Sequence, residues 1–194
     1  MTIKKTHPWI TFEIDMRRAP ASLWLLLGEA NSKCEHLSYS PLKPKFAEEL
    51  LEVYLAKGVH ATTAIEGNTL SEEQVLKVLK AEANTPISQK YLEQEVQNVI
   101  DAANEIMGSV MGVGPTSITP EQIRKYNLDI LNGIETENYV VPGEYSKVNV
   151  GVTGYRGAPV ELCEDLVSRL CKWINSSKFS ETTDFPPISV GLIK

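Results

Sequence analysis

One carboxylate stands out among the residues that could do chemistry. Glu66 follows the small and apolar residues 61–65 and directly precedes Gly67 and Asn68. The local pattern places it at the end of a helix, where the negative end of the helix dipole disfavours a carboxylate. Such a group needs a compensating cation or hydrogen-bond donors. A surface glutamate paired with a neighbour meets that need, and so does a carboxylate that serves a more distant partner; the residues alone leave both interpretations open.

The histidines support no standard catalytic arrangement. The chain has three, and none lies in an HExxH zinc pattern or beside a serine or cysteine partner: His7, His36 and His60. His7 begins a histidine–proline–aromatic sequence, but no glycine-asparagine-glycine-arginine loop follows it. The sequence also has no glycine-rich phosphate loop. We expect structural or solvent-facing roles for all three histidines.

The composition is that of an ordinary globular chain. Of 194 residues, 42% are hydrophobic and 23% are charged. The net charge of −6 and the scattered lysines and arginines argue against nucleic-acid binding. No apolar stretch reaches the ~20 residues that span a bilayer, and no signal peptide is recognisable. Three cysteines without metal-binding spacing fit a reduced, cytoplasmic setting: Cys34, Cys163 and Cys171.

A long helix is predicted before Glu66. Phe46, Leu50 and Tyr54 recur at i, i+4 spacing and share one stripe of the helix. The pattern continues past Gly58 to Ile65. This helix would carry Glu66 at its carboxyl end.

The residues after Glu66 predict a sharp turn and two further helices. Gly67 is a suitable helix stop because glycine adopts the left-handed conformation at low cost. Ser71 and Gln74 form a capping box that opens the next helix. The clearest periodicity of the chain then follows, with apolar residues at three- and four-residue steps: Leu92, Val96, Val99, Ala103 and Ile106.

Two glycine-containing regions divide the second half of the chain. Residues 108–117 contain three glycines and a proline and are predicted to form a linker or loop. A helix starts at Thr119 and Pro120, with a threonine cap and proline at the first helical position, and ends at Gly133.

A β-hairpin is predicted over residues 139–157, where alternating valines are flanked by glycines. A helix follows near Pro159, with a single apolar stripe: Leu162, Leu166, Leu170 and Trp173. The predicted fold class is therefore mainly α, a helical bundle with one β-hairpin.

The residues around Glu66 resemble the inhibitory helix of Fic proteins. That signature has a serine or threonine, three further residues, a glutamate, and then glycine or asparagine; Thr62, Glu66 and Gly67 occupy these positions. The longer string TTAIEGNTLSEEQV is similar to the version in which the inhibitory helix precedes the catalytic domain in the same chain. The resemblance is most specific over residues 62–75, where helix, glycine stop, turn and capped helix coincide.

The resemblance extends over essentially the whole chain. Glu95, Val96 and Asn98 follow an EV-x-N pattern that family members place in a similar helix. Residues 119–133 resemble the first helix of the Fic domain proper, and residues 159–175 resemble the helix after the target-binding flap.

The flap itself is similar to residues 142–145 together with Val148, Asn149 and Val150. In many relatives an arginine follows the Gly-x-Tyr of this segment, whereas this chain has Ser146. The resemblance therefore implies a target-binding hairpin whose local contacts differ from those of many relatives.

Membership of the Fic family would imply AMPylation, the transfer of AMP from ATP to a hydroxyl side chain of a target protein. In such proteins a loop histidine acts as base, and an anion-binding loop and Mg²⁺ hold the phosphates. Glu66 would pair with the second arginine of that loop and so occupy the place of the ATP γ-phosphate. The implied cofactors of the full-length enzyme are ATP and Mg²⁺, and the implied partner is a protein substrate of unknown identity; a homo-oligomer stays open.

The family's catalytic loop, His-Pro-Phe-x-Asp/Glu-Gly-Asn-Gly-Arg-x-x-Arg, occurs nowhere in these 194 residues, and residues 185–194 resemble the helix that leads to it. We therefore expect residues 1–110 to be a Fic N-terminal helical region with the inhibitory helix at about 59–67. Residues 115–194 would be the beginning of the Fic domain with a flap at about 139–157. This chain alone is expected to contain no catalytic residue, hold no cofactor and transfer no AMP.

Two interpretations without enzymatic activity stay open. One is an inhibitor that acts in trans, with the Glu66 helix docking on a separate Fic subunit. A flap-like hairpin counts against it, because an inhibitor would not need its own target-binding flap. The other is a helical scaffold related to Fic proteins by descent alone.

Overall fold

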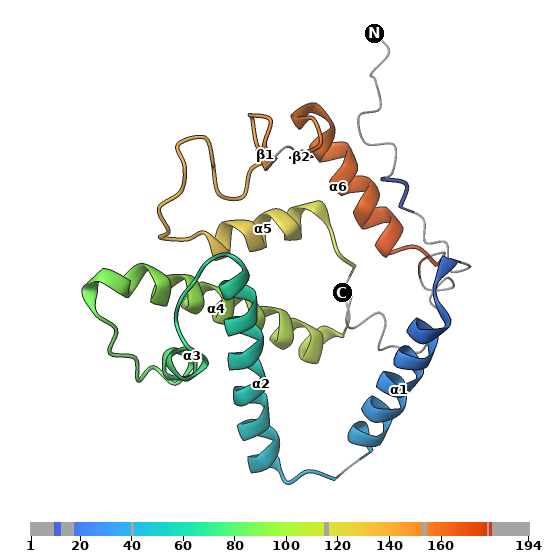
Figure 1. Cartoon of the computed structure of the whole chain (residues 1–194), viewed down its shortest axis with the longest axis vertical. Helices are drawn as coiled ribbons and strands as arrows, with labels where there is room; N and C mark the ends of the chain where they lie inside the picture. The colour runs from blue at the N-terminus through green and yellow to red at the C-terminus, as the bar shows by residue number, and fades with distance from the viewer. Residues whose placement is uncertain are drawn as a thin grey trace. The chain divides into compact units, whose positions relative to one another are not determined.

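The computed structural model describes residues 10–12, 18–39, 41–114, 117–152, 155–177 and 179. These residues are mainly α-helical, with six α-helices and one short 3-10 helix among them (Figure 1). Two compact units are present. One comprises Leu42–Ser117 and Glu121–Val148; the other comprises the described residues within Met1–Pro41, Ile118–Pro120 and Asn149–Lys194. The domain division predicted near residues 110–115 stays a prediction.

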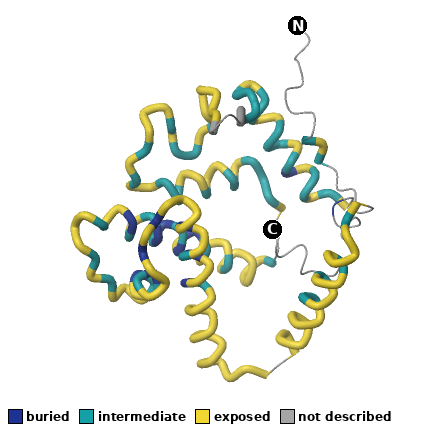
Figure 2. The backbone as a smooth tube through the Cα atoms, in the orientation of Figure 1, coloured by how far each residue is buried: buried dark blue, intermediate teal, exposed yellow. Residues whose placement is uncertain are grey.

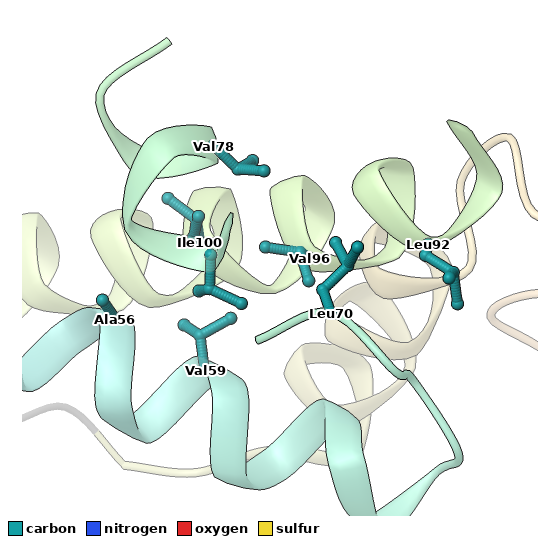
Figure 3. Packing of buried hydrophobic residues seen from close by; sticks show 8 residues of the cluster. Ala56, Val59, Leu70, Val78, Leu92, Val96 and Ile100 are labelled. Carbon is teal, nitrogen blue, oxygen red and sulfur yellow. The ribbon is translucent and has the colours of Figure 1, made fainter. Parts of the chain in front are cut away.

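The first unit is built on three helices that enclose one apolar core. These are α2 (Pro44–Ile65), α3 (Glu72–Leu79) and α4 (Lys90–Val113), with the 3-10 helix η2 (Ile87–Gln89) leading into α4. Figure 3 shows their side chains interleaving, and the buried members of the cluster are Ala56, Val59, Leu70, Val75, Val78, Leu92, Val96 and Ile100. The periodicity predicted for α4 is confirmed at Leu92 and Val96, which are both buried.

The turn between Glu66 and Ser71 is fixed by a buried side chain and by the cap of the next helix. Leu70, in the turn between α2 and α3, is 3% exposed and packs into the core cluster. The predicted capping box is confirmed: the Gln74 amide N–H donates to Ser71 Oγ over 3.3 Å, and the Ser71 amide N–H donates to Gln74 Oε1 over 2.8 Å. The turn that follows Glu66 is therefore held by the buried Leu70 and by the capped start of α3.

The predicted linker at residues 108–117 is wrong in its first half. Helix α4 continues to Val113 and ends at Gly114, whose φ is +87°. Gly108 and Gly112 lie within the helix, where each costs about 1 kcal/mol relative to alanine. Neighbouring helix-compatible residues outweigh that cost, so glycine content alone misplaced the helix end.

Helix α5 (Pro120–Ile130) begins at the predicted proline, and Gly133 beyond its end has a φ of +70°. The following segment is bound to α5 by two hydrogen bonds to the backbone of Gly143. The Arg124 Nε donates to the Gly143 carbonyl over 2.7 Å, and the Gly143 amide donates to Asn127 Oδ1 over 2.9 Å. Arg124 also lies over the ring of Tyr145, 5.7 Å from its centroid. Arg124 and Asn127, both on α5, thus fix the turn at Gly143.

The predicted hairpin over residues 139–157 is much shorter in the structure. Strands β1 (Gly151–Val152) and β2 (Tyr155–Arg156) pair antiparallel over two residue pairs, Gly151 with Arg156 and Val152 with Tyr155. Residues 139–150 form turns and irregular chain instead. Gly143, with a φ of +76°, and the turn in which Ser146 Oγ accepts from the Val148 amide interrupt the alternating pattern. Valine alternation without a continuous partner strand was insufficient to form a ladder.

The second unit contains α1 (Ala21–Ser38) and α6 (Val160–Ile174). The end of α6 is joined to the segment before α5, because Asn175 exchanges two hydrogen bonds with the backbone of Ile118, at 2.7 and 3.0 Å. Trp173 packs edge-on against Phe179, with ring centroids 4.7 Å apart. None of the helices in the described ranges is long and apolar enough to cross a membrane.

The amino-terminal half of α2 lies outside the core. Figure 2 shows this half exposed along its length, whereas the carboxyl half has buried positions. The predicted stripe of Phe46, Leu50 and Tyr54 exists as a helical face, but these side chains are 55%, 42% and 66% exposed. The helix itself runs unbroken through Gly58, as predicted.

Candidate functional site

Glu66 lies at the carboxyl end of α2, in a turn whose conformation is fixed by backbone hydrogen bonds and by a left-handed glycine. It is the last residue before the left-handed Gly67, whose φ is +97°. The Gly67 amide donates to the Ala64 carbonyl over 3.1 Å, and the Asn68 amide donates to the Thr63 carbonyl over 3.0 Å. This pair of bonds is a Schellman motif. The predicted glycine stop is confirmed, and it places Glu66 at a defined position on the helix end.

The Glu66 carboxylate is exposed and makes no ion pair or hydrogen bond with any residue that the structure describes. Lys57, one of the cations on the same helix, pairs instead with Glu72 at 4.0 Å. The interpretation of Glu66 as a locally paired surface glutamate is therefore not realised within the described residues. An acidic side chain at a helix carboxyl end stays uncompensated there.

The two adjacent threonines before Glu66 have different environments. Thr62 is exposed and lies one turn before Glu66 on the same face, at i, i+4 spacing. Thr63 is 2% exposed, and its hydroxyl donates to the carbonyl of Val59 over 3.0 Å. Thr63 thus belongs to the packed side of α2, whereas Thr62 belongs to the side that presents Glu66.

A small exposed surface surrounds the carboxylate, which we call the Glu66 face. It comprises the exposed residues of the helix end and turn whose side chains are larger than that of alanine: Thr62, Ile65, Glu66 and Thr69. Ile65 is 83% exposed although it is a large apolar residue. An exposed apolar side chain beside a carboxylate suits a weakly hydrated, planar cation, and a guanidinium is more weakly hydrated than an ammonium.

The residue that fastens this turn to the rest of the unit is Asn68, which sequence reasoning missed. Its side chain is buried, 7% exposed, and all of its polar groups are used. The amide Nδ2 donates to the Leu92 carbonyl over 3.0 Å and to Glu95 Oε2 over 2.8 Å. The carbonyl Oδ1 accepts from the Leu70 amide over 3.0 Å. The available signal was an asparagine directly after a glycine helix stop, a position from which a side chain can bond to the backbone two residues on.

Two polar residues of α4 anchor different parts of the unit. Glu95 receives the bond from Asn68, whereas Asn98, which is 5% exposed, binds the end of α5. The Asn98 amide donates to the carbonyls of Ile130 and Asn132 over 2.9 and 2.7 Å. Between them Val96 is completely buried. In the EV-x-N pattern, Val96 is therefore a core residue, and Glu95 and Asn98 on either side of it anchor other segments.

The residues predicted for a target-binding flap lie apart from regular structure. Val148, Asn149 and Val150 are all exposed. Asn149 Oδ1 accepts from the amide of Val160 over 3.1 Å, at the first turn of α6, and the Val150 carbonyl accepts from the Gly157 amide over 2.9 Å. The two valine side chains are thus available for contact, while Asn149 has a structural bond.

The described residues of the first unit include a polar hollow but no cluster of metal ligands. No group of three or more histidine, cysteine or acidic residues among them could hold a metal ion. A hollow of about 250 Å³ is lined mainly by acidic and amide residues, and two of its three acids, Glu105 and Asp129, form ion pairs with Lys125 of α5. Lys125 donates to Asp129 and to Glu105 over 2.7 Å each, and these hydrogen bonds raise the pKa of Lys125 above its ordinary value.

The structure describes two of the three histidines and all three cysteines. His60 lies on α2 and is half-buried, and His36 lies near the end of α1. His7 and residues 185–194 lie outside the described residues. Cys171 is buried, Cys163 is half-buried and Cys34 is exposed.

Comparison with protein-family models, with curated proteins and with solved structures finds no match to this chain. The Glu66 face accordingly has to be interpreted from its own geometry and from the sequence resemblance around it.

Proposed function

We propose that this chain is the regulatory portion of a Fic-type protein AMP transferase, a nucleotidyltransferase in which Glu66 is the autoinhibitory carboxylate. The observation that carries the proposal is the state of Glu66 itself. It lies on an exposed face, at a helix end fixed by a Schellman motif, without a charged partner among the described residues. A carboxylate held in a defined place and left unpaired is suited to a partner outside its own unit.

The partner that the resemblance implies is the second arginine of the family's catalytic loop. Arginine binds a carboxylate through two parallel N–H donors, which gives the pair geometric specificity as well as strength. Glu66 would then pair with the arginine that the γ-phosphate of ATP needs. Because phosphoryl-type transfer depends mainly on positioning and charge stabilisation, removal of that cation suffices to suppress it.

The chain's own residues would divide this task between them. Glu66 supplies the charge, and Ile65 supplies apolar surface beside it. Thr63 and Gly67 hold the helix end, one through its buried hydroxyl and the other through its left-handed backbone. The short β1–β2 pair and the exposed Val148 and Val150 would form the region that meets the target protein, which is the finer part of the fold prediction.

An inhibitor acting in trans is the second candidate, because the Glu66 face is exposed. A separate Fic subunit could supply the arginine as well as a later part of the same chain could. The coding sequence after codon 194 separates the two candidates: a catalytic loop encoded there favours regulation in cis.

The proposal is tested with matched charge-neutralising variants. Glu66→Gln removes the charge at the helix end, and Glu48→Gln removes an equally exposed charge from the same helix. The 194-residue chain, with Mg²⁺ and ATP, should incorporate no AMP by intact-mass measurement. Added to an active Fic transferase that lacks its own inhibitory helix, the wild-type chain and Glu48→Gln should lower the rate of AMP transfer. Glu66→Gln should not.

The expected loss of inhibition is about tenfold to a hundredfold, because hydrogen bonds to charged groups contribute about 1.5–3 kcal/mol. AMP incorporation by the isolated chain would contradict the proposal. Equal inhibition of the added transferase by Glu66→Gln and Glu48→Gln would also contradict it.

A further inference from the structure

The end of α2 is held in place from both sides but not at Glu66 itself. Thr63 is the last buried residue of the helix, and the next buried residues along the chain are Asn68 and Leu70. The four residues between Thr63 and Asn68 are exposed and do not belong to the core cluster. The direction in which Glu66 leaves the helix therefore depends on how the chain is fastened just after it.

That fastening is made by Asn68 and leads to α4. Its carboxamide donates to the Leu92 carbonyl and the Glu95 carboxylate, which lie on adjacent positions of one face of α4. Its oxygen accepts from the Leu70 amide, and its backbone amide closes the Schellman motif at Thr63. A bond to an ionised acceptor is stronger than one between neutral groups, and the 2.8 Å separation from Glu95 is in that range.

We propose that Asn68 is the positioning residue of the Glu66 site: it ties the Glu66–Gly67 turn to α4 and so sets the direction in which the carboxylate is presented. The inference rests on the proposed inhibitory role of Glu66. Regulation would then act through the Asn68–Glu95 bond, because any shift of α4 relative to α2 moves the inhibitory carboxylate. The donor–acceptor arrangement also predicts which substitutions break the bond and which restore it.

The test exchanges the two partners. Asn68→Asp keeps the size of the side chain and the acceptor for Leu70, but it places a second carboxylate against Glu95. Glu95→Gln alone keeps an acceptor for Asn68 and should change little. In the double variant, the new amide at position 95 can donate to the new carboxylate at position 68, which restores the contact with position 95 but not the bond to the Leu92 carbonyl. Asn98→Asp is the matched control, because Asn98 is equally buried and anchors α5 instead.

The direct readout is the set of backbone ¹⁵N–¹H residual dipolar couplings of the 194-residue chain. In the wild type, couplings of residues 64–67 should fit the same alignment tensor as those of α4. In Asn68→Asp they should shrink by about half or more through averaging over several orientations. They should recover in part in the Asn68→Asp/Glu95→Gln variant, which regains the contact with position 95, and stay as in the wild type in Asn98→Asp.

Three results would overturn the inference. Couplings of residues 64–67 that still fit the α4 tensor in Asn68→Asp would show that α2 alone fixes the turn. Equal loss in Asn68→Asp and Asn98→Asp would show general destabilisation. Failure of the double variant to recover any coupling would exclude the bond to Glu95 as the fastening contact.

A second arm separates this inference from the proposed function. In the protein encoded by the full reading frame, Asn68→Asp should raise AMP transfer toward the level of Glu66→Gly and add nothing in a Glu66→Gly background. If Glu66→Gly raises activity and Asn68→Asp does not, the positioning role is wrong while the role of Glu66 stands. If Glu66→Gly leaves activity unchanged, the role of Glu66 is wrong, and the couplings still decide whether Asn68 fixes the turn.

Discussion

The two halves of α2 belong to one continuous helix but differ in what they contact. The carboxyl half, with Ala56, Val59 and Thr63, packs against α3 and α4. The amino-terminal half carries Phe46 and Tyr54 with equal periodicity, yet both stay more than half exposed. An amphipathic pattern thus shows which face of a helix is apolar, and it does not show whether a partner covers that face.

The largest effect should come from a charge placed in the packed half. Val59→Asp puts a carboxylate at a position that is 3% exposed, without a cation in the core cluster, and should lower the free energy of unfolding by about 4 kcal/mol or more. Tyr54→Asp, one turn earlier on the exposed half, should change it by less than about 0.5 kcal/mol. Urea unfolding followed by far-UV circular dichroism measures both, and similar losses would show that the first half is also packed.

A cavity in the packed region should lower the free energy of unfolding by less than the buried charge does, but by more than the same change on the exposed half. Leu70→Ala removes a buried side chain beside the Glu66 turn and should cost about 3 kcal/mol. Leu50→Ala, the same change on the exposed half of α2, should cost about 0.5 kcal/mol or less. The midpoints of urea unfolding compare the pair directly; a cost for Leu50→Ala near that of Leu70→Ala would overturn the distinction.

Two glycines of the same region should respond with opposite signs. Gly67 has a φ of +97°, so Gly67→Ala is strained although open space surrounds the site, and it should destabilise by about 1 kcal/mol. Gly58 lies inside α2 with equally open space, so Gly58→Ala should stabilise by about 0.5–1 kcal/mol. Thermal unfolding of the two variants checks the signs, and a stable Gly67→Ala would argue against the left-handed turn.

The smallest effect is expected at a surface contact of the exposed half. Glu52 forms an ion pair with Lys80 at 3.3 Å, and the two side chains are 48% and 43% exposed. Glu52→Gln should cost about 0.5 kcal/mol or less, and high salt should abolish the difference from the wild type. A larger, salt-independent cost would indicate that the amino-terminal half of α2 is fastened more firmly than this pair allows.

Local signals in the sequence were sufficient to predict most elements around the site. Gly67, Ser71 and Gln74 each have a physical role that depends on neighbours within a few residues, and all three are confirmed. The same reasoning overestimated the effect of Gly108 and Gly112, because helix formation through Val113 depends on the sum over the segment.

Features that depend on distant partners could not be predicted in this way. The bonds of Asn68 reach residues 24 and 27 positions away, and no local pattern specifies them. The valines near residue 150 alternate as strand residues do, but a strand needs a neighbour, and within the described ranges only the Gly151–Val152 and Tyr155–Arg156 pair is formed. The exposure of Phe46 could not be predicted for the same reason. A stripe of apolar residues shows which face of a helix is apolar, but not whether another element packs against that face.

The most direct test of the central claim is the rate of auto-AMPylation of the protein encoded by the full reading frame, with and without Glu66→Gly. The change removes the carboxylate from the Glu66 face and leaves the Schellman turn intact, since glycine is tolerated at a helix end. We predict a rise of about tenfold or more, and no rise for Glu48→Gln. Auto-AMPylation that stays at the wild-type level in Glu66→Gly would contradict the inhibitory role of Glu66.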